Sequence, residues 1–175
     1  MRSRIALWIA IPVLVVMTAF IAVLAFSDDD PAASPLLGRQ APSIVSTTID
    51  GEDFDLDAYR GQFVLVNFFA PWCVPCVREH PELVNFERRQ SVGGDVAVVS
   101  VVFDAEVDAV RTFFDDNGGD WPVVTDPDKI IQLDYGVTGL PESYLIAPDG
   151  IVLTKITGGV TAADLDALLA SVQGL

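Results

Sequence analysis

Two cysteines that directly follow an apolar run constrain the fold of this chain most. Residues 63–69 are apolar except for one asparagine, a pattern typical of a buried central strand. Cys73 and Cys76, the only cysteines in the sequence, come next, at the predicted start of a helix over residues 73–90. The free N–H groups and positive dipole end of a helix start stabilise a thiolate, which is the form that attacks a disulfide. The pattern therefore predicts a dithiol–disulfide exchange centre, with Cys73 as the nucleophile and Cys76 as the resolving thiol.

Two other interpretations of the cysteine pair compete with this one. Half of a zinc site would need further ligands, because zinc in structural sites takes four. The sequence has one histidine, His80, and no second cysteine pair, so we expect neither a metal nor a cofactor. A purely structural disulfide would close a loop of only about four residues, which restricts the unfolded chain little. Exchange chemistry is therefore the preferred interpretation.

The rest of the chain alternates between predicted strands and helices. A hairpin is predicted over residues 44–56 around Asp50-Gly51, and a second one over 143–157 around the turn at 148–150. Between them we expect a strand at 96–103, helices at 106–117 and 128–135, and a short extended segment at 121–124. Thr161 is the expected cap of a last helix that ends near residue 172. This order predicts one α/β domain over residues 36–175 with a mixed sheet.

The N-terminal part of the chain has a different composition. Residues 5–26 contain no charged side chain, and a helix of this length would span about 33 Å against a hydrocarbon core of about 30 Å. Arg2 and Arg4 precede this stretch and three aspartates follow it at 28–30, which places the N-terminus in the cytoplasm under the positive-inside rule. We therefore predict a membrane anchor in residues 1–27, a linker at 28–35 and an extracytoplasmic domain. A cleaved signal peptide is the alternative, although its apolar region is usually only about 7–15 residues long.

The part of the chain after the predicted anchor is strongly acidic. All 25 acidic residues lie after residue 27, together with eight of the ten basic ones, which gives this part a net charge of −17. The sequence has no basic stripe that could neutralise phosphates, so we expect no nucleic-acid partner. Anionic lipid would repel the domain, and the N-terminal helix must then supply the membrane attachment.

Three segments together resemble the membrane-tethered TlpA/ResA/CcmG (DsbE) group of thioredoxin-like proteins, which serve cytochrome c maturation. They are residues 36–42 at the domain start, 66–80 around the cysteines, and 135–146, which contains the sequence Gly-Leu-Pro-Glu. The resemblance covers residues 36–175. It implies a thioredoxin fold, with a central mixed β-sheet flanked by helices and an N-terminal β-hairpin extension, preceded here by one transmembrane helix.

The resemblance also implies roles for residues beyond the cysteines. Pro141 matches the family's cis-proline, which packs against the disulfide. Glu79 matches an acidic residue that sets thiol acidity, and it lies three residues after Cys76, on the same helical face. Glu142 matches a second acidic residue, beside the cis-proline. Carboxylates close to a thiol raise its pKa, so both glutamates are candidate site residues along with Pro141. Asn67 stands where thioredoxin itself has a buried aspartate.

The resulting hypothesis is a membrane-anchored thiol-disulfide oxidoreductase whose catalytic domain is extracytoplasmic. Acting as a monomer, it would reduce the Cys-x-x-Cys-His disulfide of apocytochrome c and be recharged by a thiol carrier in the membrane. Acidic surroundings oppose thiolate stabilisation, the route by which strong oxidants gain their power, and so favour the reducing direction. Two alternatives are an oxidant that introduces disulfides into exported proteins, and a binding or chaperone module with a structural disulfide.

Overall fold

The computed structural model describes residues 16–18, 34–90 and 96–173 of the 175-residue chain. The chain divides into two compact units, Met1–Ala33 and Ser34–Leu175, and the second unit is the α/β domain. Across the described ranges, no helix combines the length and the apolar character needed to span a bilayer. The predicted anchor at residues 5–26 lies outside the described residues except at 16–18, and it therefore stays a prediction.

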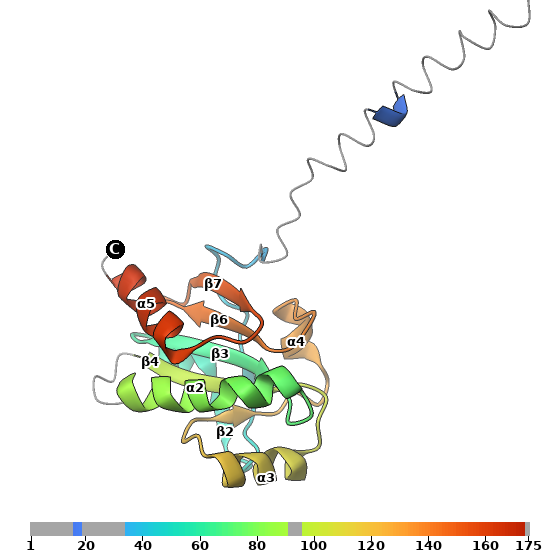
Figure 1. Ribbon diagram of the computed structural model, residues 1–175, viewed down its shortest axis with the longest axis vertical. Coiled ribbons are helices and arrows are strands. Elements are labelled where there is room, and N and C mark those ends of the chain that lie inside the picture. The colour runs from blue at the N-terminus through green and yellow to red at the C-terminus, as the bar shows by residue number, and fades with distance from the viewer. Residues whose placement is uncertain (1–15, 19–33, 91–95, 174–175) are drawn as a thin grey trace, which may run out of the picture. The chain divides into compact units, whose positions relative to one another are not determined.

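A five-stranded mixed sheet forms the centre of the domain (Figure 1). Its strands, in chain order, are β3 (Phe63–Phe69), β4 (Val96–Val102), β5 (Val123–Val124), β6 (Glu142–Ile146) and β7 (Val152–Thr157). In space their order is β5-β4-β3-β6-β7. β3 pairs parallel with β4 and antiparallel with β6, so the apolar run before the cysteines is the central strand, as predicted.

Four α-helices accompany the sheet in the described part of the chain. They are α2 (Val74–Gln90), α3 (Val107–Asn117), α4 (Ile130–Asp134) and α5 (Ala162–Gln173). Each predicted strand and helix of the domain is present, with its ends within two residues of the expected positions. The thioredoxin-like arrangement of a mixed sheet flanked by helices is thus confirmed for the domain.

Different elements cover the two faces of the sheet. Buried side chains of α2, α3 and α5 form one core cluster with Leu65, Phe69 and the two cysteines. Residues of α4 and of the N-terminal segment form a second cluster around Phe68 and Tyr144. Successive side chains of a strand point to opposite faces, so β3 has to be apolar on both sides. This is why its sequence shows a continuous run rather than an alternation.

The N-terminal segment of the domain covers part of both edges of the sheet. β1 (Val45–Thr47) and β2 (Asp53–Asp55) form the predicted antiparallel hairpin. Directly after β1, Thr48 bridges to Val124 of β5. At the opposite edge, Gln40 bridges to Ile151, the residue directly before β7. Unpaired strand edges invite pairing with other chains, and these bridges occupy them with the protein's own backbone.

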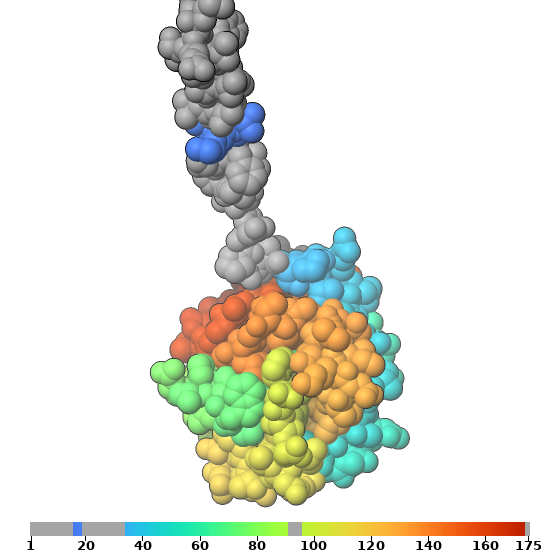
Figure 2. Space-filling view, turned by 90° about the vertical axis from the view of Figure 1, so that its right-hand side faces the viewer, coloured from blue at the N-terminus to red at the C-terminus, as the bar shows by residue number. Residues whose placement is uncertain are grey.

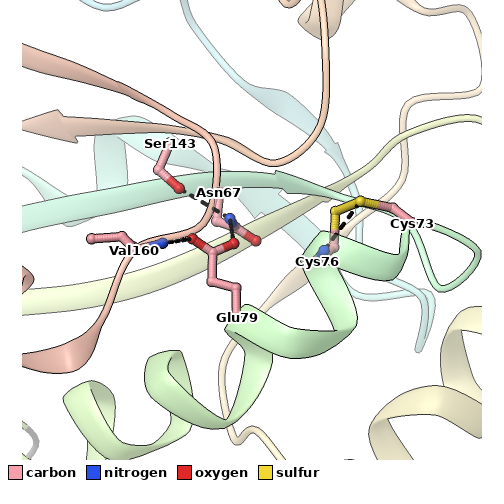
Figure 3. Close-up of a disulfide and its surroundings, with 6 residues drawn as sticks. All are labelled: Asn67, Cys73, Cys76, Glu79, Ser143 and Val160. Carbon is pink, nitrogen blue, oxygen red and sulfur yellow. Dashed lines mark hydrogen bonds between the residues drawn. A yellow bond between two sulfur atoms is a disulfide. The ribbon is translucent and has the colours of Figure 1, made fainter.

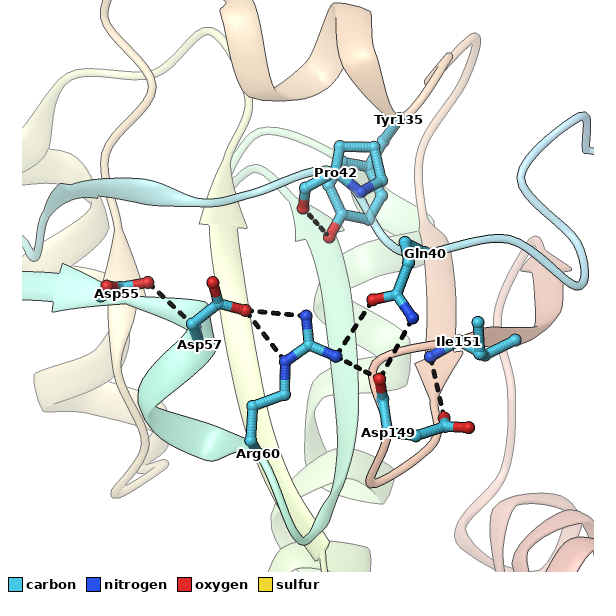
Figure 4. A network of polar contacts seen from close by, with 8 residues as sticks. All are labelled: Gln40, Pro42, Asp55, Asp57, Arg60, Tyr135, Asp149 and Ile151. Carbon is cyan, nitrogen blue, oxygen red and sulfur yellow. Dashed lines mark hydrogen bonds and ion pairs between the residues drawn. The ribbon is translucent and has the colours of Figure 1, made fainter.

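Arg60 fastens this N-terminal segment to the turn between β6 and β7 (Figure 4). It follows the short helix η1 (Leu56–Tyr59), and its guanidinium donates to the Gln40 side chain and to the Asp149 carbonyl. Asp57 completes the arrangement with an ion pair at 2.8 Å. Gly150 has a φ of +85°, and a Cβ there would collide with the Arg60 guanidinium. The backbone conformation therefore favours glycine at this turn, and a larger residue would also have to displace the Arg60 guanidinium from its partners.

Candidate active site

Cys73 and Cys76 form a disulfide at the start of α2 (Figure 3). Both residues are buried, with Cys73 just before the helix and Cys76 in its first turn. The backbone N–H of Cys76 donates to Cys73 Sγ over 3.2 Å. A free N–H group of the helix start is thus directed at the first sulfur, where it would stabilise a thiolate after reduction. This geometry suits an exchange centre in which Cys73 is the attacking thiol.

Glu79 lies one helical turn after Cys76, inside the protein. The residue is only 4 % exposed, and its carboxylate accepts hydrogen bonds from the Val160 N–H over 3.1 Å and from Asn67 Nδ2 over 3.3 Å. Burial raises the pKa of Glu79 to about 7, although both hydrogen bonds act in the opposite direction. Glu79 is therefore a buried carboxyl group that exchanges a proton near neutral pH, and not a solvated charge on the helix surface.

Asn67 connects Glu79 to strand β6. Its side-chain amide also donates to Ser143 Oγ over 3.0 Å, and both residues are almost fully buried. Asn67 and Ser143 are direct partners in the β3–β6 ladder, so their side chains point to the same face, toward α2 (Figure 3). The sequence alone did not single out Ser143. The available indication was a single polar residue, Asn67, in the apolar run of β3 and a serine within β6.

Pro141 lies at the end of the sheet that carries the disulfide. The Leu140–Pro141 peptide bond is cis, as the resemblance implies. Pro141 directly precedes β6, whose first residue pairs with Phe68. This register places Pro141 beside the end of β3, from which the chain continues to Cys73. The N–H of Gly158 donates to the Pro141 carbonyl over 2.9 Å and joins it to the end of β7.

Glu142 lies on the opposite face of the sheet from Glu79. It alternates with Ser143 along β6, and it points to the side of Phe68 and α4. There its Oε2 forms an ion pair with Lys155 Nζ at 3.0 Å, with the two side chains 1 % and 7 % exposed. The structure therefore brings Glu79 together with Asn67 on the α2 side and separates Glu142 from them by the thickness of the sheet.

Lys155 is a residue that the sequence did not reveal. If the pairing of Ile146 with Val152 continued without a shift, Lys155 would pair with Ser143. The lysine side chain would then point toward α2. The ladder instead shifts by one residue beside Ile146, so that Lys155 lies opposite Tyr144. This bulge turns the lysine to the face of Glu142. Because a bulge has no clear sequence pattern here, the buried ion pair was not predictable.

A surface groove of about 890 Å³ adjoins the disulfide loop. The residues that line it include Pro71, Trp72, Glu106 and Asp126. Trp72 is 59 % exposed, and its indole N–H donates to the Asp104 carbonyl over 3.0 Å. In Figure 2 the green surface around the start of α2, the yellow surface of α3 and the orange surface around α4 adjoin on this side of the domain. Trp72 is thus exposed beside the disulfide loop, where a partner could contact it.

His80 is a packing residue. It is buried, its ring contacts Phe113 and Phe114, and its Nε2 lies 2.7 Å from the Gly118 carbonyl oxygen. Burial lowers the pKa of His80, against the effect of this hydrogen bond. Within the described residues, no three potential metal-binding side chains gather closely enough to hold an ion.

The disulfide lies at a helix start that follows the central strand, and a loop with a cis-proline ends beside that strand. This arrangement is typical of proteins that carry out thiol–disulfide exchange. Comparisons with known proteins agree with this class. Residues 36–169 match the family model described as Redoxin. The chain is 32 % identical over 155 residues to the thiol:disulfide interchange protein HelX of Rhodobacter capsulatus, covering 85 % of each chain. It is 33 % identical over 133 residues to the thiol-disulfide oxidoreductase ResA of Bacillus thuringiensis, covering 76 % of each.

A solved structure gives the same result at the level of the fold. A thiol:disulfide interchange protein of the thioredoxin family from Chlorobium tepidum matches with a TM-score of 0.70 at 26 % identity, covering 80 % of this chain and 98 % of that one. The chain belongs to the Redoxin family, and it is a thiol-disulfide oxidoreductase.

Proposed function

We propose that this oxidoreductase is an extracytoplasmic reductant that opens the Cys-x-x-Cys-His disulfide of apocytochrome c during cytochrome c maturation. The observation that carries the proposal is the buried Glu79 carboxyl one turn after the second cysteine. It supports a centre that handles protons at neutral pH and that does not stabilise a thiolate strongly.

The reaction starts from the reduced protein. The Cys73 thiolate attacks one sulfur of the substrate disulfide, forms a mixed disulfide and releases the other substrate sulfur as a thiolate. The N–H of Cys76, which contacts Cys73 Sγ in the oxidised protein, favours the charged form of the nucleophile before the attack.

The second step closes the protein's own disulfide. Cys76 loses its proton and attacks Cys73 Sγ, which releases the second substrate thiolate. The substrate has then gained two electrons and the protein has lost two. Glu79 is the proposed proton acceptor for Cys76, because it lies on the same face of α2 and its pKa of about 7 suits proton transfer near neutrality. A dithiol carrier in the membrane then reduces the Cys73–Cys76 disulfide again.

The surroundings of the cysteines favour the reducing direction. Strong oxidants hold their nucleophile as a highly stabilised thiolate, with a pKa of about 3.5. Here the buried carboxyl group of Glu79 belongs to a residue one helical turn after Cys76, and Arg78, the nearest cation in the sequence, is exposed to solvent. A charged Glu79 opposes a second negative charge nearby.

The reduction potential tests the proposed direction. The protein is equilibrated with mixtures of reduced and oxidised glutathione, and the fraction of disulfide is measured at each ratio. We expect a potential nearer the roughly −270 mV of thioredoxin than the roughly −120 mV of strong oxidants. The reduced protein should also open a Cys-x-x-Cys-His peptide disulfide. A potential above about −180 mV would move the protein to the oxidants.

The domain organisation belongs to the same proposal. Residues 1–27 act as a signal anchor with a transmembrane helix near 5–26, residues 28–35 as a linker, and 36–175 as a monomeric catalytic domain on the outer side of the membrane. The uncharged stretch and its flanking charges support this arrangement. Cys73, Cys76, Glu79, Pro141 and Glu142 are the proposed site residues.

A further inference from the structure

A buried ion pair supports the loop that carries Pro141. Glu142 Oε2 pairs with Lys155 Nζ at 3.0 Å. The other oxygen, Oε1, accepts hydrogen bonds from the Thr138 N–H at 3.3 Å and from Thr138 Oγ1 at 3.1 Å. One carboxylate therefore joins strand β7 to the loop that precedes the cis-proline, with one oxygen directed at each.

The same loop has a second attachment to β7. The carbonyl oxygen of Pro141 accepts from the N–H of Gly158, the residue that follows the strand. The loop is thus fastened through Thr138 near its middle and through Pro141 at its end. Both contacts lead to β7, the strand whose bulge turns Lys155 toward Glu142.

The ion pair has no net charge. Burial lowers the pKa of Lys155, but the Glu142 carboxylate and the Tyr144 hydroxyl outweigh this effect and raise it, so the ammonium group stays charged. Lys155 Nζ also lies 5.7 Å from the centroid of the Tyr144 ring. A neutral pair on the far face of the sheet acts on the cysteines far more weakly than a lone carboxylate would.

We propose that Glu142 and Lys155 are positioning residues, which hold the loop at residues 136–141 through Thr138 and so fix Pro141 beside the disulfide for the docking of a polypeptide substrate. The proposal rests on the thiol–disulfide exchange function given above. It assigns Glu142 a task other than adjusting thiol acidity, and it adds Lys155 and Thr138 to the residues that support the site.

The double variant Glu142→Gln/Lys155→Met tests the proposal without leaving a lone buried charge, which would be costly in itself. With a Cys-x-x-Cys-His peptide disulfide as the substrate, we expect KM to rise about tenfold and kcat to change less than about twofold, because docking is disturbed and the thiols are not. The pH midpoint of Cys73 alkylation should match that of the wild type. Glu79→Gln is the reference that should shift this midpoint. Lys155→Arg, which keeps the charge, should retain the wild-type KM.

Thr138 provides a second, milder test, because it is exposed and its replacement leaves the core intact. Thr138→Val removes one of the two hydrogen bonds to Glu142 and should raise KM about threefold, at the low end of the net contribution of one hydrogen bond. Thr138→Ser keeps the hydroxyl group and should leave KM unchanged.

Two outcomes would overturn the proposal. One is a shift in the pH midpoint of Cys73 alkylation that is as large in the double variant as in Glu79→Gln. Such a shift would mean that Glu142 acts on the thiol through its charge. The other is an unchanged KM in Thr138→Val, which decides the question even if the double variant does not fold. Failure of the wild-type protein to exchange with the peptide at all would instead refute the proposed function.

Discussion

The two sulfurs of the disulfide have different neighbours, so the two cysteines should behave differently once reduced. Cys73 Sγ accepts a hydrogen bond from the Cys76 N–H, whereas Cys76 is the more deeply buried of the two residues. Cys76→Ser should therefore accumulate a mixed disulfide between Cys73 and its substrate, because the resolving thiol is missing. Cys73→Ser should accumulate none. Non-reducing gel electrophoresis after acid quenching measures both, and equal trapping by the two variants would contradict the assignment.

Glu79 should make stability depend on pH. Its pKa is about 7 in the folded protein against 4.5 for the free group, so between these values the folded state holds a proton that the unfolded state has lost. Stability must then fall as the pH rises through this interval. At about 1.4 kcal/mol per pH unit, the loss attributable to Glu79 is roughly 3 kcal/mol. Urea unfolding of the oxidised protein at pH 4.5 and pH 8 measures it.

The matched control for this pH effect is Glu79→Gln, which keeps the shape of the side chain and cannot ionise. Other carboxylates titrate in both proteins, so the difference between wild type and variant isolates the contribution of Glu79. Parallel stability curves for the two proteins would show that Glu79 does not carry a raised pKa.

At the scale of elements, the start of α5 offers a direct measurement of local stabilisation. The Asp164 N–H donates to Thr161 Oγ1 over 3.2 Å, and the Thr161 N–H donates back to Asp164 Oδ2 over 3.3 Å. This reciprocal arrangement satisfies N–H groups that a helix start leaves free. Thr161→Ala should lower the free energy of unfolding by about 1 kcal/mol. Thr161→Ser keeps the hydroxyl and should lose less than half as much, and equal losses would show that the cap is not the cause.

The elements themselves were predictable because each has a local pattern. The apolar run of β3 indicated a central strand, Asp50-Gly51 indicated the hairpin, and Thr161 indicated a helix start. Contacts that depend on pairing between distant strands were not predictable. Ser143 reaches Asn67 only through the β3–β6 register.

In the candidate site too, the sequence indicated some features and tertiary packing determined the others. The cysteine pair and the cis-proline were expected from sequence and resemblance, and both are present. The burial of Glu79 and the partner of Glu142 depend on tertiary packing. A one-residue bulge decides which face Lys155 occupies, and no property of the lysine itself indicates it. The sequence therefore located the cysteine pair, and the fold determined the partners of the two glutamates.

At the scale of the whole molecule, the topology of the chain is the main prediction. The charges that flank residues 5–26 predict an N-terminus in the cytoplasm and residues 36–175 outside it. A reporter enzyme that is active only outside the cytoplasm should be active when it is fused to the C-terminus of this chain. The fusion protein should sediment with membranes. Activity of a reporter that works only in the cytoplasm would contradict the topology. A mature chain that starts after residue 27 would contradict the anchor but not the export.

The covered sheet edges matter for an enzyme whose proposed clients are unfolded polypeptides. A client strand that met a bare edge could add to the sheet and draw the enzyme into a growing aggregate. Gln40 at β7 and Thr48 at β5 occupy those positions first. An incoming chain must therefore displace part of the enzyme before it can lengthen the sheet, while the sulfurs at the end of β3 require no such displacement. The N-terminal segment of the domain thus makes it harder for a client to add a strand to the sheet, while a transient mixed disulfide with the client can still form.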